Sequence, residues 1–237
     1  MHPEGLTKQQ EKLANLLFIT KIQAKVKRRQ HLPNGSFSFY DVTRPTSPID
    51  FAQEGEFALK LHERKPEALL SPIYINLRNL PPNVLDQIGL VLAEIPSEEK
   101  PDFCTGIPNA GVPLAEAYSK ASKIPIREIF AKVQTASKRK IVSQEQPRNK
   151  GNIRIIDDLV TQADTKLEAI EAAEAQGYKI TDIVVLVDRE QGGSLQLSKA
   201  GYKFKSAFTL SQLLKYYLRT GKLDQNRFNQ VTSYLSF

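Results

Sequence analysis

Two adjacent carboxylates, Asp157 and Asp158, follow an apolar run and are the side chains in this sequence best suited to chemistry. Neighbouring carboxylates repel each other, so a fold that keeps them together usually supplies cations or hydroxyl donors. A ribose diol with a magnesium-bound pyrophosphate offers both. The chain then enters an expected helix at Thr165, whose free N–H groups and dipole favour a phosphate. A plainer interpretation stays open, in which both acids only cap that helix.

Arg189 is a second candidate, within the run Asp188-Arg189-Glu190-Gln191-Gly192-Gly193. A guanidinium fork suits a carboxylate ligand, and the two glycines let the backbone approach that ligand closely. The alternative is a surface salt bridge from Arg189 to Asp188 or Glu190.

Composition excludes several other chemistries. One cysteine, Cys104, and three scattered histidines cannot form an internal disulfide or assemble a zinc site, and a single cysteine suits a reducing compartment. The loop 106–111 is not a Walker loop, because Val112-Pro113 replace the required Lys-Ser/Thr. The lack of an eighteen-residue apolar run and of an apolar signal core predicts a cytoplasmic protein without a membrane span.

The elements that must position these residues begin near residue 56. Expected strands at 103–107, 126–130, 153–156, 183–187 and 203–208 alternate with expected helices at 84–95, 112–122, 165–176, 194–200, 211–219 and 223–235, after β-prone runs at 57–61 and 73–77. This alternation predicts an α/β fold with a mostly parallel, twisted sheet and helices on both faces. Ligands bind such sheets at the carboxyl ends of the strands, so the loops 106–111, 132–150, 157–165 and 188–193 should form the site.

The N-terminal part has a different character. Residues 6–30 predict a helix, and residues 31–55, rich in Pro, Ser, Gly and Asn, predict a linker. We therefore expect residues 1–54 to be a basic helical segment and linker added to a domain of residues 55–237. Residues 1–30 carry +5 of the net charge of +7. A solvated helix end explains this charge, and contact of residues 21–29 with nucleic acid or an acidic partner is the alternative.

The run Asp157-Asp158-Leu159-Val160-Thr161 resembles the phosphoribosyl-pyrophosphate signature of type I phosphoribosyltransferases, and residues 185–193 resemble a stretch of the orotate phosphoribosyltransferases. Residues 57–60 and 71–76 are similar to the N-terminal strands of that family, and 106–115 to its pyrophosphate loop. The resemblance covers residues 55–235 in order. It implies a type I phosphoribosyltransferase-like fold with a flexible hood loop. It also implies transfer of ribose 5-phosphate from phosphoribosyl pyrophosphate to orotate, with Mg²⁺ carried by the substrate, in a homodimer.

The resemblance also assigns roles to individual residues. Asp157 and Asp158 would hold the ribose hydroxyls and the hydrated metal ion. Lys132, in the hood loop, would assist catalysis. Among the substrate-binding residues, Lys60 would lie near the pyrophosphate end and Tyr74 near the base. Thr161 and Thr165 would bind the 5-phosphate, and Arg189 would pair with the orotate carboxylate.

The chain departs from the family pattern at three places. Ala163 replaces a glycine of the phosphate loop. Asp164 puts a negative charge beside the expected phosphate, although it would be a good N-cap for a helix that starts at Thr165. In the hood loop only Lys132 matches, with Ala131 and Thr135 among the departures. The turn after Lys60 is replaced by an insertion that runs up to residue 71.

Three functions stay open on this basis. The first is orotate phosphoribosyl transfer. The second is a non-catalytic binding or regulatory protein with this fold, in contact with nucleic acid through its basic N-terminal segment. The third is transfer to another base, against which Arg189 argues because an uncharged purine gives a guanidinium no carboxylate to bind.

Overall fold

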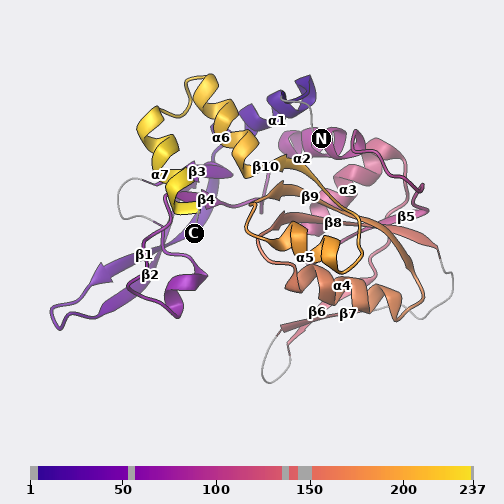
Figure 1. The fold of residues 1–237 in the computed structure, drawn as a ribbon, viewed down its shortest axis with the longest axis horizontal. Helices are drawn as coiled ribbons and strands as arrows, with labels where there is room; N and C mark the ends of the chain where they lie inside the picture. Colours follow the sequence, from indigo (N-terminus) through magenta and orange to yellow (C-terminus); the bar gives the residue numbers. More distant parts are fainter. Residues whose placement is uncertain (1–4, 53–56, 135–138, 144–150, 236–237) are drawn as a thin grey trace. The chain divides into compact units, whose positions relative to one another are not determined.

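A computed structural model of the chain describes residues 5–52, 57–134, 139–143 and 151–235 (Figure 1). Its contacts define two compact units: a first unit of residues 1–13 with 81–213, and a second unit of residues 14–80 with 214–237. The chain passes from one unit to the other within two helices, α1 (Lys8–Ile19) and α6 (Leu210–Arg219), and between Leu80 and Pro81. Among the described residues, no helix combines the length and apolar character that a membrane crossing requires.

The first unit is built on a four-stranded parallel sheet in the order β10-β9-β8-β5. Its strands are β5 (Phe103–Gly106), β8 (Asn152–Val160), β9 (Lys179–Asp188) and β10 (Phe204–Thr209). Helices α2 (Pro82–Ala93) and α3 (Gly111–Ser122) lie along one face, and α4 (Asp164–Glu174) and α5 (Gly193–Lys199) along the other (Figure 1). The predicted α/β fold with a parallel sheet covered on both faces is confirmed.

Alternation along β8 shows how the two faces are filled. Ile153 and Ile155 are fully buried in the core with Ile170 of α4. The intervening Arg154 is 1% exposed and lies on the α3 side, where it makes two 2.8 Å hydrogen bonds to the Asp182 carboxylate. A strand buried on both faces has a nearly continuous apolar sequence, which is why the central strands could be predicted.

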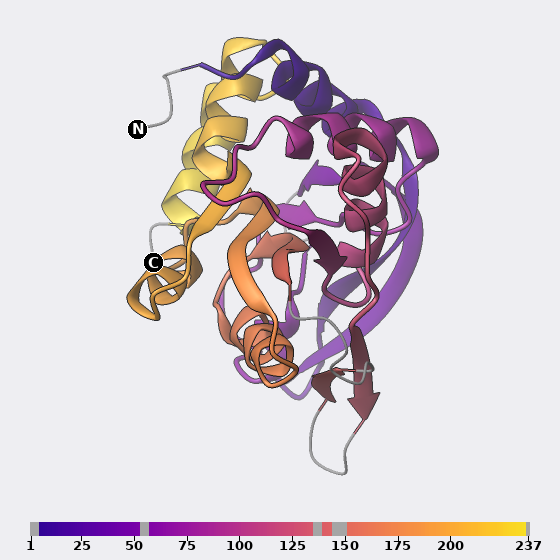
Figure 2. The ribbon, with the colours of Figure 1, turned by 90° about the vertical axis from the view of Figure 1, so that its right-hand side faces the viewer.

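The predicted N-terminal helix over 6–30 is wrong beyond residue 19. Residues Ile22–His31 form β1, which pairs antiparallel with β2 (Phe37–Thr46), the two strands that run along each other in Figure 2. Ile22, Ala24 and Val26 are buried while the residues between them are exposed, and this period of two is that of a strand. The apolar residues of the predicted helix that precede this strand lie in helix α1.

The predicted linker over 31–55 is also wrong, because most of this segment forms strands. It contains β2 and β3 (Ile49–Phe51), and β3 pairs with β4 (Ile73–Ile75). The turn between β1 and β2 contains Asn34-Gly35, with Gly35 at φ 81°, which is the residue type that a tight hairpin turn favours. The second unit also holds the 3-10 helix η1 (Lys60–Glu63) and ends with α7 (Gln225–Leu235).

Two further expectations need correction in the first unit. The strand predicted over 126–130 is reduced to an isolated bridge from Ile126 to Cys104, and the regular strand β6 (Phe130–Gln134) starts where it should have ended. The loop predicted over 132–150 contains a second strand, β7 (Arg139–Ser143), paired antiparallel with β6. Residues 135–138 and 144–150 of that loop, with Thr135, lie outside the described residues.

Candidate functional site

The acid pair lies inside the last part of β8 rather than in a loop after it. Asp157 is in register with Val185 of β9, and the pairing continues to Val160 opposite Asp188. The strand was predicted to end at residue 156, but Leu159 and Val160 are β-prone and extend it. The loops after β8 and β9 therefore begin side by side, as a site at the carboxyl ends of parallel strands requires.

A buried lysine holds the first acid. Lys166, in the first turn of α4, places its Nζ atom 2.8 Å from Asp157 Oδ2, and both side chains are 7% exposed. The same ammonium donates a 2.6 Å hydrogen bond to the carbonyl oxygen of Leu159. A buried carboxylate needs such a cation, because a charge without a partner is costly to remove from water. Sequence reasoning missed Lys166, and its only signal was a lysine in the first turn of the helix that follows the acid pair.

The second acid is held by the strand itself. Asp158 Oδ1 accepts the N–H of Leu159 at 2.8 Å, and the N–H of Asp158 donates to Asp157 Oδ1 at 2.9 Å. Burial, and secondly the negative charge of Asp157, raise the pKa of Asp158 to about 7. The pair therefore exchanges a proton near neutral pH, and a cation or hydroxyl donor that binds there favours its release.

The glycine-bounded loop 106–111 lies directly against the acid pair. A Cβ atom on Gly111 would be 2.5 Å from the carbonyl oxygen of Ile156 and 3.1 Å from Asp157 Cα, so only glycine fits. The N–H of Ile107 donates to that same carbonyl at 2.9 Å. The expectation that this loop and the acids belong to one region is met by these contacts.

The loop that leads into α4 differs from its prediction. Asp164 was expected to cap a helix starting at Thr165, but α4 starts at Asp164, and Ala163 is the cap residue, with no side-chain cap hydrogen bond. A side chain from α5 supplies a hydrogen bond at this helix start instead: Gln196 Oε1 accepts the N–H of Ala163 at 2.8 Å. Ala163 has φ −86°, so its backbone does not require glycine. Asp164 and Thr165 are exposed.

A chain of carboxamides continues this arrangement across the loop. Gln196 Nε2 donates to Gln162 Oε1 at 2.6 Å, and Gln162 Nε2 donates to the carbonyl oxygen of Gln191 at 2.6 Å. The N–H of Gly193 donates to the carbonyl oxygen of Thr161 at 3.1 Å. The expected phosphate loop and the expected orotate loop are thus tied together.

Arg189 follows β9 and is half-buried. Its N–H donates to the carbonyl oxygen of Val160 at 3.0 Å, which fixes its backbone next to β8. Of the neighbouring acids, Asp188 accepts the N–H of Glu190 at 2.8 Å, and Glu190 accepts the N–H of Ser211 at 2.7 Å. The backbone of Arg189 thus lies beside the end of β8, the strand that carries the acid pair.

The remaining predicted residues are distributed elsewhere. Lys132 lies in β6 opposite Ile141. Lys60, at the start of η1, and Tyr74, in β4, belong to the second unit. The Tyr74 ring stacks on Phe57 with centroids 5.2 Å apart, and burial raises its pKa, so its hydroxyl stays protonated. The structure therefore brings together Asp157, Asp158, Thr161 and Arg189, all in the first unit.

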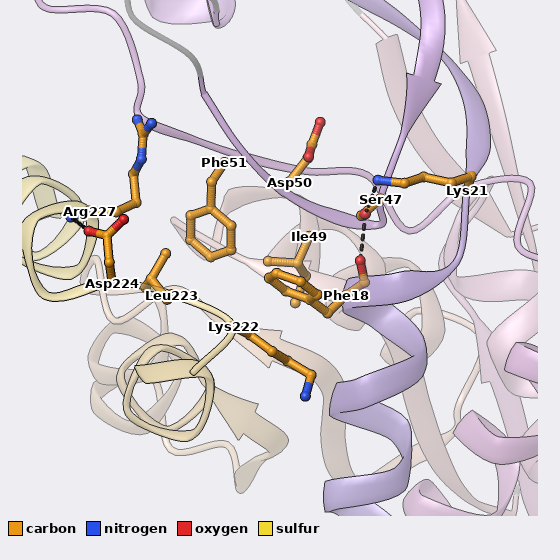
Figure 3. A pocket seen from close by; sticks show the side chains of 10 residues that line it. All are labelled: Phe18, Lys21, Ser47, Ile49, Asp50, Phe51, Lys222, Leu223, Asp224 and Arg227. Carbon is orange, nitrogen blue, oxygen red and sulfur yellow. Dashed lines mark hydrogen bonds between the residues drawn. The ribbon is translucent and has the colours of Figure 1, made fainter. Parts of the chain in front are cut away.

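A hollow of about 270 Å³ in the second unit is a separate feature (Figure 3). None of the predicted site residues lines it. Two contacts join polar groups of its lining: Lys21 Nζ donates to Ser47 Oγ at 3.0 Å, and Asp224 accepts the N–H of Arg227 at 2.8 Å. Its apolar lining is formed by Phe18, Ile49, Phe51 and Leu223, as Figure 3 shows. The hollow is not the candidate site.

Comparison with known proteins gives the family. The parallel sheet with helices on both faces is the fold of type I phosphoribosyltransferases. The chain is 30% identical over 157 residues to the orotate phosphoribosyltransferase of Rhodopseudomonas palustris (strain TIE-1), a match that covers 61% of this chain and 82% of that protein. The chain belongs to the orotate phosphoribosyltransferase family. No family model matches it.

Two relatives are longer than this chain. Uridine 5'-monophosphate synthase of Bos taurus is 32% identical over 187 residues, which cover 76% of this chain and 37% of the bovine protein. The solved structure of Leishmania donovani UMP synthase is 30% identical with a TM-score of 0.65, and the match covers 80% of this chain and 39% of that one. The chain thus spans less than half the length of these two relatives.

Proposed function

We propose that this protein transfers ribose 5-phosphate from phosphoribosyl pyrophosphate to N1 of orotate, giving orotidine 5'-monophosphate and pyrophosphate. The C1–oxygen bond breaks with its electron pair going to the leaving pyrophosphate, a C1–N1 bond forms, and the proton of N1 passes to the pyrophosphate or to water. The observation that carries the proposal is the acid pair beside the loop that starts at Arg189, on adjacent parallel strands. Carboxylates suit the ribose diol and the positive charge that develops on the ring, and a guanidinium suits the carboxylate of orotate.

We assign the donor substrate to the end of β8 and the start of α4. Asp157 and Asp158 hold the ribose hydroxyls and a hydrated Mg²⁺, and Thr161 and Thr165 belong to the 5-phosphate site, near the dipole of α4. In the described part of the chain, no three His, Cys, Asp or Glu side chains gather to hold a metal ion. In this proposal the ion comes bound to the pyrophosphate, with most of its ligands from the substrate and water.

We assign the base and the leaving group to the other predicted residues. Arg189 pairs with the orotate carboxylate, and Tyr74 lies near the base. Lys60 and Lys132 neutralise the charge that develops on the departing pyrophosphate. We further propose a homodimer in the cytoplasm, and residues 55–237 as the segment that carries the activity, with residues 1–54 added to it.

One observation favours the second candidate, a binding protein without turnover. Asp164 is exposed at the start of α4, where its carboxylate lies close to a bound phosphate in the proposed site. Like charges about 5 Å apart repel by roughly 3 kcal/mol at an effective dielectric of about 20. Weak binding of phosphoribosyl pyrophosphate would favour this candidate.

The test is a direct assay. Protein, Mg²⁺, phosphoribosyl pyrophosphate and orotate are mixed and orotate absorbance is followed, with calorimetry for each ligand. Arg189→Ala should weaken orotate binding by about 2–4 kcal/mol while leaving phosphoribosyl pyrophosphate binding nearly intact. Arg219→Ala, which removes an arginine at the end of α6, is the control. Absence of orotate consumption refutes the enzyme, and unchanged orotate affinity in Arg189→Ala refutes the role of Arg189.

A further inference from the structure

Two stretches of the N-terminal part contact each other: the strands β1 and β2, here called the hairpin, which the resemblance does not cover, and residues 59–70, here called the insert, which consist of the matched Leu59-Lys60 and the insertion that follows them. Both belong to the second unit. The insert holds Lys60, and the chain on either side of it holds Phe57 and Tyr74. The hairpin and the insert bind each other through charged side chains.

Arg29 of β1 makes the strongest of these contacts. Its Nη1 atom donates to the carbonyl oxygens of Pro66 and Ala68, at 2.6 and 2.8 Å. The guanidinium also lies over the ring of Phe37 in β2, 4.6 Å from its centroid. A planar cation held by a ring on one side and two carbonyls on the other has little freedom, so it fixes the insert relative to the hairpin.

Lys27, on the same face of β1, adds a second contact. Its Nζ atom is 2.6 Å from Glu63 Oε1 at the end of η1. The carbonyl oxygen of Lys27 accepts the N–H of Ala58 at 2.9 Å, just before the insert. The hairpin therefore binds the insert at its entry, in its helical turn and near its end.

The insert is also closed on itself by a buried histidine. His62 is fully buried; its Nδ1 atom accepts the N–H of Leu59 at 2.8 Å, and its Nε2 atom is 2.9 Å from the carbonyl oxygen of Leu69. Compact loops of this length with adjacent ends are held by their own side chains. Lys60 lies between Leu59 and His62, so its main chain is fixed on both sides.

The opposite face of the hairpin packs on the neighbouring strand segment. Ala24 and Val26 form a buried cluster with Phe57, against which Tyr74 packs. The Tyr74 hydroxyl donates to the main-chain carbonyl of Lys25 at 3.4 Å. The segments that carry Lys60 and Tyr74 are thus both held by one hairpin.

We propose that the hairpin positions the pyrophosphate end of the substrate site, with Arg29 and Lys27 as positioning residues that act through the insert on Lys60. This inference rests on the proposed function, in which Lys60 binds the pyrophosphate end. It also gives the basic residues of β1 a task other than nucleic-acid contact. An error of about 1 Å in such a group can cost about a hundredfold in rate.

Arg29→Gln tests the proposal, with Lys25→Gln as the matched control. Lys25 lies on the same face of β1, but its ammonium pairs with Asp41 of β2 at 3.2 Å, within the hairpin. Arg29→Gln should raise the KM for phosphoribosyl pyrophosphate about ten- to a hundredfold and leave the KM for orotate within about twofold. Arg29→Lys should recover part of this loss, because one ammonium can still reach a carbonyl. Lys25→Gln should change neither constant.

Hydrogen exchange provides a readout that does not depend on turnover. Arg29→Gln should speed amide exchange in residues 59–70, and Lys25→Gln should not. If Arg29→Gln fails to fold by circular dichroism, Lys27→Gln takes its place, with a smaller change in the same direction. Unchanged exchange in the insert, or an unchanged KM for phosphoribosyl pyrophosphate beside an active wild type, overturns the proposal. An inactive wild type that binds neither substrate overturns the proposed function instead.

Discussion

Replacing Lys166 with methionine tests whether the acid pair depends on its buried cation. Lys166 Nζ lies 2.8 Å from Asp157 Oδ2, with both side chains 7% exposed. Two unit charges at that distance attract by about 6 kcal/mol at an effective dielectric of about 20, and the desolvation of both groups offsets much of this. Methionine fills most of the same space but leaves the carboxylate buried without its cation. We expect the free energy of unfolding to fall by about 3–5 kcal/mol at neutral pH.

A second variant separates the charge from the packing. Lys166→Met combined with Asp157→Asn removes both charges, so the buried carboxylate that penalises the single variant is gone. The double variant should be more stable than Lys166→Met by about 2 kcal/mol, because it no longer holds a buried carboxylate without a cation. Lys179→Met is the control, because Lys179 forms a 2.7 Å pair with Glu99 in which both side chains are exposed. That variant should lose less than about 1 kcal/mol.

Urea unfolding followed by circular dichroism measures all three variants. Equal slopes of free energy against urea show that the comparison is one of stability alone. If Lys166→Met loses no more than Lys179→Met, the buried pair contributes no more than an exposed one. In that case the orientation of Asp157 comes from the strand and from Gly111, and Lys166 does not hold the acid in place.

Three further predictions concern residues around the same sheet. Because burial raises the pKa of Asp158 to about 7, the folded state holds a proton that the unfolded chain releases near pH 4. The free energy of unfolding should therefore fall as the pH rises from about 4 to 7, and Asp158→Asn should remove that component, which urea unfolding at pH 5 and 8 measures. Arg154→Met removes both 2.8 Å hydrogen bonds from Arg154 to the buried Asp182 and leaves Lys205 Nζ 3.6 Å away, so a cost of about 3 kcal/mol in urea unfolding is expected. Gly111→Ala places a Cβ atom 2.5 Å from the carbonyl oxygen of Ile156, so a fall in stability of about 1–3 kcal/mol and weaker phosphoribosyl pyrophosphate binding by calorimetry are expected.

The parallel sheet could be predicted because burial on both faces leaves a clear sequence signal. β9 contains an unbroken apolar run from Ile183 to Val187, and every residue of that run is fully buried. Only buried strands of this kind require so many consecutive apolar residues. The helices between the strands were located to within a few residues, because each presents an apolar face to the sheet.

The N-terminal hairpin could not be predicted by the same reasoning. Its strands are largely polar, and only Ile22, Ala24 and Val26 show the period of two, directly after a helix with its own apolar face. Pro45 lies inside β2, where a proline usually argues against a strand. The turn Asn34-Gly35 was a local signal for the hairpin, and it was interpreted as part of a linker.

Only part of the candidate site could be predicted from the sequence. The acid pair and Arg189 could be found because their neighbours form local runs that mark the ends of strands. Lys166 and Gln196 could not, because each acts on a residue that the fold brings to it: Asp157 on β8, and Ala163 before α4. Contacts of this kind depend on helix packing and leave no local pattern.

The charge of the N-terminal segment is partly balanced by acids elsewhere in the fold. Residues 1–30 carry +5, for which a solvated helix end is the expected explanation and contact with nucleic acid or an acidic partner the alternative. Yet Lys25 pairs with Asp41 and Lys27 with Glu63, and both acids lie outside that segment. Arg29 donates to main-chain carbonyls. Opposite charges about 3 Å apart cancel at distances beyond the Debye length of about 8 Å, so these pairs present little field to a distant nucleic acid. Lys27 and Arg29 also bind the insert to the hairpin, which gives these basic residues of β1 a structural role.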